Sequence, residues 1–259
     1  MSDTFTPVEA DHVMRHWTYR SEGKIPIGSA LHKRMFCEML LTTHNPYKPA
    51  VIDWPKLDPA ALKRETSLPI WDIAVQTEGR APIRVLTFAE THDDPQLRDA
   101  LRMNGGEEAR HKVVLSKLVE AYSIQLAPEP PYLAPKDALR AWMLTGYSEC
   151  IDSFFAFGLF EAARTSGYFP EALVETFEPV IQEEARHILF FANWVAWYRR
   201  SLPWYRKPWF LAKTASVWFS LIRDRISSQE VSIKAARRKT RISPRMSATP
   251  LRAMFPCAR

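Results

Sequence analysis

The sequence predicts an all-α protein whose central part is a four-helix bundle, and three observations lead to that prediction. Apolar side chains recur at helical spacing in four long stretches between about residues 66 and 200. Prolines and glycines separate these stretches, and no segment alternates apolar and polar residues as a strand does. One pentapeptide, EEARH, occurs in the second stretch and again in the fourth. We therefore expect the bundle to be built around a repeated site.

The elements follow in a simple order along the chain. Residues 1–65 are rich in turn signals and contain one expected short helix at 29–41, so we interpret them as an N-terminal arm wrapped on the bundle. The bundle, 66–200, has helical stretches at 68–92, 95–122, 135–164 and 170–200. Residues 201–259 form an aromatic and basic helical extension, which we expect to end in a disordered basic tail from about Lys234.

Composition restricts the class of protein. The chain has 259 residues, 46% of them hydrophobic, which is typical of a globular protein. It begins without a signal-peptide pattern and has no apolar run of roughly 18 residues, so we expect a cytoplasmic protein. The three cysteines, Cys37, Cys150 and Cys257, are far apart and form no C-x-x-C pair. Any metal site must therefore use other ligands.

Charge is distributed unevenly along the chain. Residues 199–259 hold 15 basic and 2 acidic side chains, a net charge of +13, whereas residues 1–198 carry a net charge of −7. The segment 194–223 also interleaves tryptophans with arginine and lysine, which suits either a helix in a membrane interface or a fifth helix packed on the bundle. No nucleic-acid motif accompanies the basic residues, so a nucleic-acid partner is not expected.

The two EEARH copies span Glu107–His111 and Glu183–His187. Residues three apart share a helix face, so Glu108 with His111, and Glu184 with His187, each present a carboxylate beside an imidazole. Two such pairs, joined by one glutamate from each of two further helices, make the dinuclear carboxylate arrangement of four-helix bundles. The repeat therefore predicts two more ligands, on the first and third stretches.

The position of the turns selects these two glutamates. In antiparallel neighbours, ligands at the same height lie equally far from the connecting turn. Glu78 and Glu108 have their midpoint at residue 93, on the turn at 93–95, whereas Glu90 would move the midpoint inside the second stretch. The same rule selects Glu149 rather than Glu161 as the partner of Glu184.

A single E-x-x-H pair is usually a solvated helix face, but two copies with symmetric partners favour a metal site. Four buried carboxylates would repel one another strongly without cations between them. Two prolines complicate the site: Pro82 removes the amide that would bond the Glu78 carbonyl, and Pro179 is expected to disturb the fourth helix before its ligands.

On these residues the segment 68–199 resembles the ferritin-like diiron carboxylate superfamily. The doubled E-E-x-R-H is similar to the (D/E)-E-x-R-H of its oxygen-activating branch, which includes acyl carrier protein desaturases, bacterial multicomponent monooxygenases and ribonucleotide reductase small subunits. The resemblance implies that Glu107 orients His187 and Glu183 orients His111, with Arg110 and Arg186 neutralising the acids. It also implies a ferritin-like fold and two iron ions, with manganese or a mixed iron–manganese pair as alternatives.

The function that the resemblance implies is an oxidoreductase that uses O₂ to hydroxylate, desaturate or N-oxygenate an organic substrate. Electrons would come from an external reductase or ferredoxin, because the chain has no flavin or nicotinamide fingerprint. Two alternatives stay open: a ferritin- or rubrerythrin-like protein for iron storage or peroxide detoxification, and a hydroxylase associated with a membrane or RNA. A homodimer and a peripheral membrane contact also stay open. The phenylalanines Phe154, Phe155, Phe157 and Phe160 would line a substrate pocket or simply fill the core.

Overall fold

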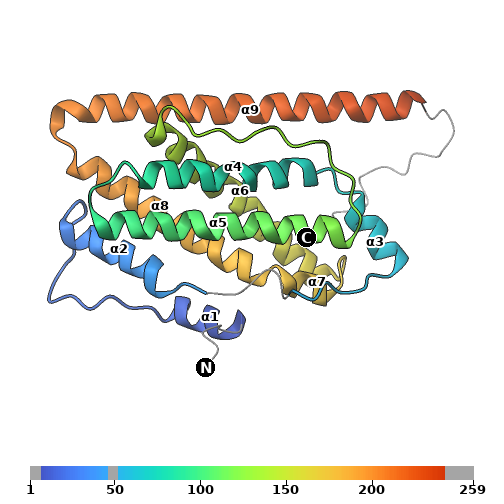
Figure 1. The fold of residues 1–259 in the computed structure, drawn as a ribbon, viewed down its shortest axis with the longest axis horizontal. Helices are drawn as coiled ribbons and strands as arrows, with labels where there is room; N and C mark the ends of the chain where they lie inside the picture. Colours follow the sequence, from blue (N-terminus) through green and yellow to red (C-terminus); the bar gives the residue numbers. More distant parts are fainter. Residues whose placement is uncertain (1–6, 46–51, 243–259) are drawn as a thin grey trace, which may run out of the picture. The chain divides into compact units, whose positions relative to one another are not determined.

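The computed structural model describes residues 7–45 and 52–242, and these residues are helical without any strand (Figure 1). The all-α part of the expectation is confirmed. The elements are α1 (Pro7–Arg15), α2 (Ala30–Thr42), α3 (Pro59–Thr66), α4 (Trp71–Ala89), α5 (Pro95–Ala121), α6 (Ala138–Ser166), α7 (Glu171–Thr176), α8 (Glu178–Ser201), the 3-10 turn η2 (Trp204–Arg206) and α9 (Lys207–Ile242).

The helix ends follow ordinary capping chemistry. Asp94 accepts a hydrogen bond from the amide of Leu97 at 2.9 Å, and Pro95 occupies the first turn of α5, where no amide partner is lost. Asp137 caps α6 in the same way. Gly167 ends α6 with a φ of 63°, in the left-handed region that glycine adopts without strain. These caps fix where α4 turns into α5 and where α6 ends.

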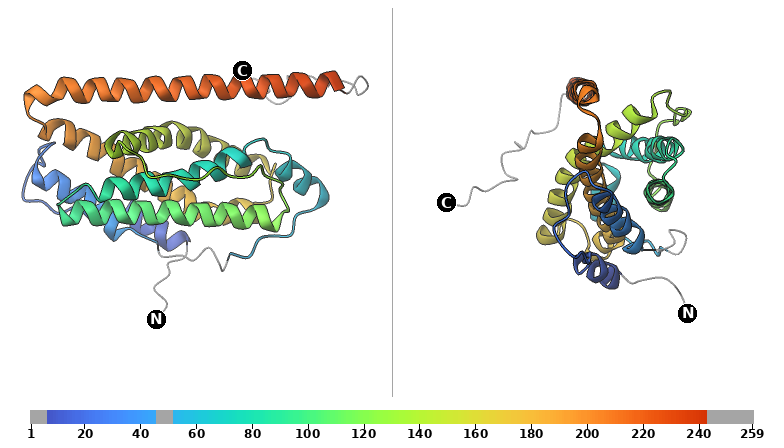
Figure 2. Two further views of the ribbon diagram at one scale, coloured as in Figure 1. Left: turned by 45° about the horizontal axis from the view of Figure 1, so that its top comes forward. Right: turned by 90° about the vertical axis from the view of Figure 1, so that its left-hand side faces the viewer.

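Four long helices, α4, α5, α6 and α8, lie side by side (Figure 1). α4 packs along α5 and α6, and α6 packs along α8. The short α2 from the arm packs against both α5 and α8 (Figure 2). Large aromatic side chains fill the space between these helices, and the fully buried ones include Phe36 of α2, Trp142 of α6, and Phe190, Phe191 and Trp194 of α8. The arm therefore contributes to the core.

The fourth helical stretch departs from the sequence interpretation. It is divided at Phe177 into α7 and α8, and Pro179 lies in the first turn of α8. The fourth stretch is thus interrupted before its candidate ligands, as expected from Pro179, and the proline itself lies where it breaks no amide bond. Pro82, by contrast, lies inside α4 as expected.

The chain separates by its contacts into two compact units, Met1–Val217 and Trp218–Arg259, with the boundary inside α9. α9 continues to Ile242, so the beginning of the expected disordered tail, 234–242, is helical. The remainder of that tail, 243–259, and Cys257 with it, lie outside the described residues. Among the helices of the described residues, none combines the length and apolar character that crossing a membrane requires.

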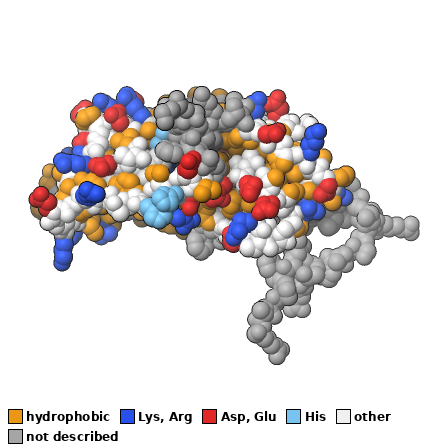
Figure 3. All heavy atoms as spheres, turned by 90° about the horizontal axis from the view of Figure 1, so that it is seen from below, with side chains coloured by type: hydrophobic (Ala, Val, Ile, Leu, Met, Phe, Trp, Pro, Cys, Tyr) orange, Lys and Arg blue, Asp and Glu red, His pale blue; other side chains and the backbone are white. Residues whose placement is uncertain are grey.

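The face on the side of α1 carries acidic and basic side chains in a mixed pattern, with histidine side chains among them (Figure 3). His12 and His16 of α1 are both exposed, and their rings stack with centroids 4.1 Å apart. The Nδ1 atom of His16 also lies 2.9 Å from the carbonyl oxygen of His12. These contacts fit an ordinary polar helix face.

Candidate metal centre

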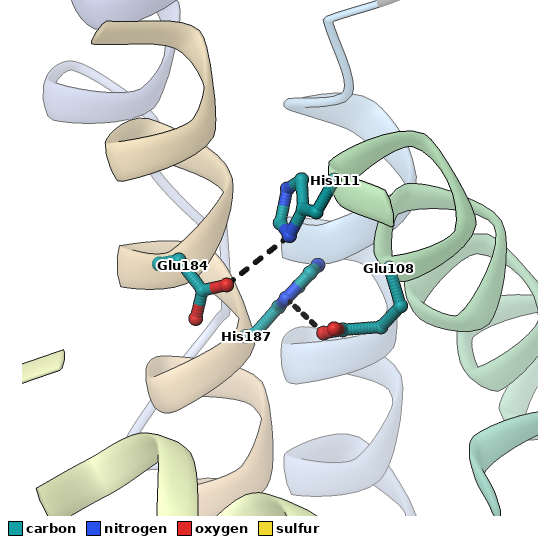
Figure 4. A group of neighbouring side chains, drawn as sticks. All are labelled: Glu108, His111, Glu184 and His187. Atoms are coloured by element: carbon teal, nitrogen blue, oxygen red, sulfur yellow. Dashed lines mark ion pairs between the residues drawn. The ribbon is translucent and has the colours of Figure 1, made fainter. Parts of the chain in front are cut away.

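The structure contains a buried group of glutamate and histidine residues that could hold a metal ion. Glu108 and His111 come from α5, and Glu184 and His187 come from α8. Each of the four offers a ligand atom, and these atoms all lie within 4.8 Å of one another. Figure 4 shows the four side chains converging between the two helices.

The contacts inside this group cross from one helix to the other. The Nδ1 atom of His111 lies 3.1 Å from Glu184 Oε1, and the Nδ1 atom of His187 lies 2.8 Å from Glu108 Oε1 (Figure 4). Each imidazole thus directs the same ring nitrogen towards the carboxylate of the opposite helix. The two E-x-x-H pairs therefore contact each other between α5 and α8.

Glu78 of α4 and Glu149 of α6 lie next to this group. Glu78 Oε2 is 3.8 Å from His111 Nδ1. Burial raises the pKa of Glu78 and of Glu149 well above the ordinary range, and the nearby charges of Glu108 and Glu184 raise both further. Four helices therefore bring carboxylates to one place.

The turn rule distinguished these two glutamates from exposed ones. Glu90 and Glu161, the candidates that the rule rejected, have side chains that are 59% and 57% exposed. Glu90 pairs with Arg102, and Glu161 pairs with Arg164. Neither approaches the buried group.

Several inward atoms of the site have no hydrogen-bond partner outside the group itself. They are Glu78 Oε2, Glu108 Oε1, His111 Nδ1, both carboxylate oxygens of Glu149, and His187 Nδ1. Buried polar atoms are normally hydrogen-bonded, because an unpaired one costs about 1–3 kcal/mol. Atoms of this chemistry, oxygen and imidazole nitrogen, are the ligands that iron and manganese accept. The residues therefore fit a metal centre.

A second, outer pair of carboxylates, those of Glu107 and Glu183, contacts the two imidazoles at the ring nitrogen that faces away from the centre. Glu107 Oε2 lies 2.7 Å from Nε2 of His187, and Glu183 Oε2 lies 2.9 Å from Nε2 of His111. Each hydrogen bond joins α5 to α8. Since an ionised carboxylate only accepts, Nε2 must donate in both pairs, and Nδ1 is left to face the centre.

Both arginines of the repeats contact the outer acids across the same two helices. Arg186 Nη1 donates to Glu107 Oε1 at 2.6 Å, and Arg110 donates to Glu183. Burial alone would raise the pKa of Glu107, but the charge of Arg186 and hydrogen bonds from His187 and His44 hold that pKa well below its usual range. Burial similarly opposes protonation of His111 and His187, yet the surrounding carboxylates raise both pKa values well above the ordinary one.

His44 was not identified from the sequence. It follows α2 directly, and its Nδ1 atom lies 2.6 Å from Glu107 Oε1. Arg186 is tied to the same helix end: its Nε donates to Thr43 Oγ1 at 2.8 Å, and its Nη2 donates to the carbonyl of Leu40. The only sequence signal was a histidine at the end of a short helix, 63 residues before Glu107.

His44, Glu107 and Glu183 form a second close group of acidic and histidine side chains in the described residues. Their carboxylates already accept from Arg186 and Arg110 as well as from the imidazoles. Glu107 and Glu183 of this second group therefore serve to orient His187 and His111 of the first group.

Two glycines allow the helices to approach closely at the level of the site. A Cβ atom added to Gly105 would lie 2.8 Å from the side chain of Leu86 on α4, and one added to Gly146 would lie 2.1 Å from the ring of Phe191 on α8. Each glycine is one helical turn before a glutamate of the site, Glu108 or Glu149. The absent side chains thus set the spacing between helices that carry the candidate ligands.

A cavity of about 470 Å³ lies between α1, α6 and α8. Phe157 and Phe160 of α6 and Ile181 of α8 provide its apolar lining, and charged residues of α1, α6 and α8 complete it. Ile181 is one turn from Glu184, and Phe157 is about two turns from Glu149, on the helix faces that carry those carboxylates. The side chains of Phe154 and Phe155 lie outside the described residues.

Comparisons with known proteins add no relative. A scan against protein-family models, a search of curated proteins and a search of solved structures each found no match to this chain. The site must therefore be interpreted from its own residues.

Proposed function

We propose that this protein is a dinuclear iron oxidoreductase with a ferritin-like four-helix bundle formed by α4, α5, α6 and α8. The proposed ligands are Glu78, Glu108, His111, Glu149, Glu184 and His187. In this proposal the protein uses O₂ to oxidise an organic substrate, and an external reductase or ferredoxin supplies electrons. Manganese, or a mixed pair, is the alternative metal content.

One observation carries the proposal: Glu108, His111, Glu184 and His187 converge inside the protein beside the buried carboxylates of Glu78 and Glu149, and both Glu149 oxygens and Glu78 Oε2 have no hydrogen-bond partner. Four ionised carboxylates carry the charge that two divalent cations neutralise. Without those cations the carboxylates must take up protons, as the raised pKa values of Glu78 and Glu149 indicate. A dinuclear centre removes both the repulsion and the unpaired atoms.

The protein's own groups prepare the site for this chemistry. A bound iron pair would supply electrons to O₂ and a place for it to bind. Glu107 and Glu183 hold the Nε2 protons of the histidines, so that each Nδ1 keeps a lone pair directed inward. Arg186 and Arg110 form ion pairs with those outer carboxylates. Glu108, His111 and His187 are at most 2% exposed, so water has little access to these three groups.

The organic substrate needs a binding place, and the pocket lined by Phe157, Phe160 and Ile181, on the helices that carry Glu149 and Glu184, is the candidate. Its volume of about 470 Å³ lies within the usual range of small-molecule pockets. Its lining combines apolar and charged side chains, which favours a substrate that has both an apolar part and a polar group. This cavity supports an enzyme in preference to an iron store, which needs no organic pocket.

The first test is metal content. Protein produced with iron should carry about two metal ions per chain by mass spectrometry, and Glu108→Ala or His187→Ala should remove most of them. Glu90→Ala and Glu161→Ala are matched controls, because these glutamates lie on the same helices as candidate ligands but are exposed. Full occupancy in both ligand variants would overturn the proposed site.

The second test separates an enzyme from a store. The diferrous protein should consume about one O₂ per dinuclear centre and then stop until electrons are added, because the metals are held in place. An iron-storage protein would go on oxidising added ferrous ion far beyond its bound metal. Formation of a soluble mineral core would favour the storage alternative. No reaction with O₂ would contradict the proposed activity.

A further inference from the structure

Exposed aromatic side chains lie in the segment that connects α8 to α9. Figure 1 shows where this connection lies in the fold. We call the segment Arg199–Leu211 the aromatic corner. Trp204 is 81% exposed, Tyr205 62% and Trp209 50%. Aromatic side chains of this size are usually buried in part against protein, so three exposed ones within six residues mark an interaction surface.

These side chains do not belong to the packing of α9 on the rest of the first unit. Phe210 is 1% exposed and its ring lies 5.3 Å from that of Tyr198 on α8, and Val217 is fully buried. One side of the beginning of α9 is therefore already covered by protein. Trp204 and Trp209 lie outside that contact: Trp204 is mostly in water, and Trp209 is half exposed, with Lys213 Nζ 4.9 Å from its ring centroid.

The aromatic corner is also basic. Arg199, Arg200 and Arg206 are exposed, and Lys207 follows them directly. The sequence has no acidic residue from Ala185 to Arg223. The partner must therefore cover apolar rings and supply negative charge at the same time.

The loop before α2 extends this surface with an aliphatic side chain. Gly28 lies so close to Arg200 that an added Cβ would be 2.5 Å from the Arg200 Cβ, and a φ of 92° allows that approach. Its neighbour Ile27 is 59% exposed, and Leu211 of the corner is 49% exposed. Ile27 and Leu211 argue against a nucleic acid as the partner. A nucleic acid offers bases for stacking and phosphates for cations, but isolated aliphatic side chains gain little from it.

We infer that the aromatic corner docks on an anionic lipid bilayer. Tryptophan and tyrosine rings favour the interface between headgroups and acyl chains, and arginine and lysine favour the phosphates of anionic lipids. Ile27 and Leu211 can enter the same layer. A second copy of this chain fits less well, because a symmetric interface would place the same basic cluster against itself. The inference does not depend on the metal centre.

The test uses the full chain and sedimentation with vesicles of phosphatidylcholine, either alone or mixed with phosphatidylglycerol. The wild type should bind the mixed vesicles, and the double variant Trp204→Ala/Trp209→Ala should bind at least about tenfold more weakly, because two interfacial side chains are lost. The matched control is Leu133→Ala/Leu159→Ala, two side chains that are 80% and 71% exposed outside the corner. The control should bind as the wild type does.

A second variant tests the charge requirement. Arg199→Gln/Arg206→Gln should weaken binding to the mixed vesicles and make it less sensitive to salt, since fewer cations meet the lipid phosphates. Equal binding of the wild type and the tryptophan variant would assign the interaction to the basic tail and overturn the inference. So would equal binding to both vesicle types, no binding to either, or a dimer in light scattering that only the tryptophan variant dissociates.

Discussion

Arg186 of the second EEARH repeat has a side chain that is 2% exposed, whereas the side chain of Arg110, its counterpart in the first repeat, is 19% exposed. Arg186 contacts Glu107 and also reaches Thr43 Oγ1 and the Leu40 carbonyl on α2. Arg110 contacts Glu183 and lies 3.6 Å from Glu107, its neighbour on α5. Two identical pentapeptides therefore have different surroundings.

The inner halves of the repeats are nearly equivalent, and the outer halves are not. Both histidines contact a glutamate of the opposite helix through Nδ1 and an outer acid through Nε2. Glu107, however, accepts from His44 in addition to Arg186 and His187. The difference comes from α2, which covers α5 and α8 on that side. The two copies of the motif thus make equivalent contacts at the candidate metal centre, whereas the residues around those contacts differ.

The largest expected effect comes from removing each arginine in turn. Arg186→Ala leaves the buried carboxylate of Glu107 without its cation, so we expect a loss of about 3–5 kcal/mol in the free energy of unfolding of the metal-free protein. Arg110→Ala should cost about 1–2 kcal/mol, because water can reach its partly exposed position. Urea unfolding of both variants measures the difference. Equal losses would mean that the two repeats are energetically equivalent.

The outer carboxylates give the next effect, on metal affinity. Glu107→Gln and Glu183→Gln keep the shape of the side chain but weaken the hold on a histidine, so each should reduce metal affinity by about 10- to 100-fold. Glu107→Gln should have the larger effect, since it also leaves Arg186 buried without its countercharge. Competition with a chelator measures both. A larger effect of Glu183→Gln would reverse the comparison.

The pH dependence of the metal-free protein should show opposing contributions. Folding raises the pKa values of four groups: Glu78, Glu149, His111 and His187. The folded state therefore binds protons at these groups more tightly than the unfolded state does. Their contribution to stability falls as pH rises above the ordinary carboxyl and imidazole pKa values. The lowered pKa of Glu107 contributes stability above its ordinary value, which is lost as pH falls through the folded one.

We therefore expect metal-free protein to lose stability as pH rises above the ordinary carboxyl and imidazole pKa values, and to lose the Glu107 contribution as pH falls below the ordinary carboxyl pKa. Metal-loaded protein should lack the alkaline loss, because metal binding favours deprotonated ligands. Glu107→Gln should lose the acid contribution but keep the alkaline one. Thermal unfolding across pH, with and without metal, measures these slopes, and a metal-free protein that gains stability towards pH 9 would contradict the expectation.

The sequence predicted what depends on local spacing. Helix periodicity and breakers located the long helices, and the turn rule chose Glu78 and Glu149 over Glu90 and Glu161, because antiparallel geometry relates residue number to height. The ferritin-like fold and the metal identity stay predictions. The interruption of the fourth stretch was expected from Pro179, but its division into two helices at Phe177 was not, since a proline fits equally well as an interruption and as a helix start.

The contacts of the α2 end with Glu107 and Arg186 could not be predicted from local spacing. The contacts of His44 and Thr43 join residues 63 and 143 positions apart, and no periodicity or turn relates such distant positions. Their chemistry is also common: a histidine after a short helix has many ordinary roles. Only tertiary packing of α2 on α5 and α8 brings them to Glu107.

The smallest effect concerns His44, which contacts Glu107 from the end of α2. His44→Gln removes one of the hydrogen bonds to Glu107 Oε1, but Arg186 still donates to that oxygen, so we expect a loss of only about 0.5–1.5 kcal/mol. His12→Gln, at an exposed position on α1, is the control and should change stability little. The double variant His44→Gln/Glu107→Gln shows whether His44 contributes to stability through Glu107. If His44 acts through Glu107, the two losses will be less than additive, whereas full additivity would mean that His44 stabilises the arm independently of the metal centre.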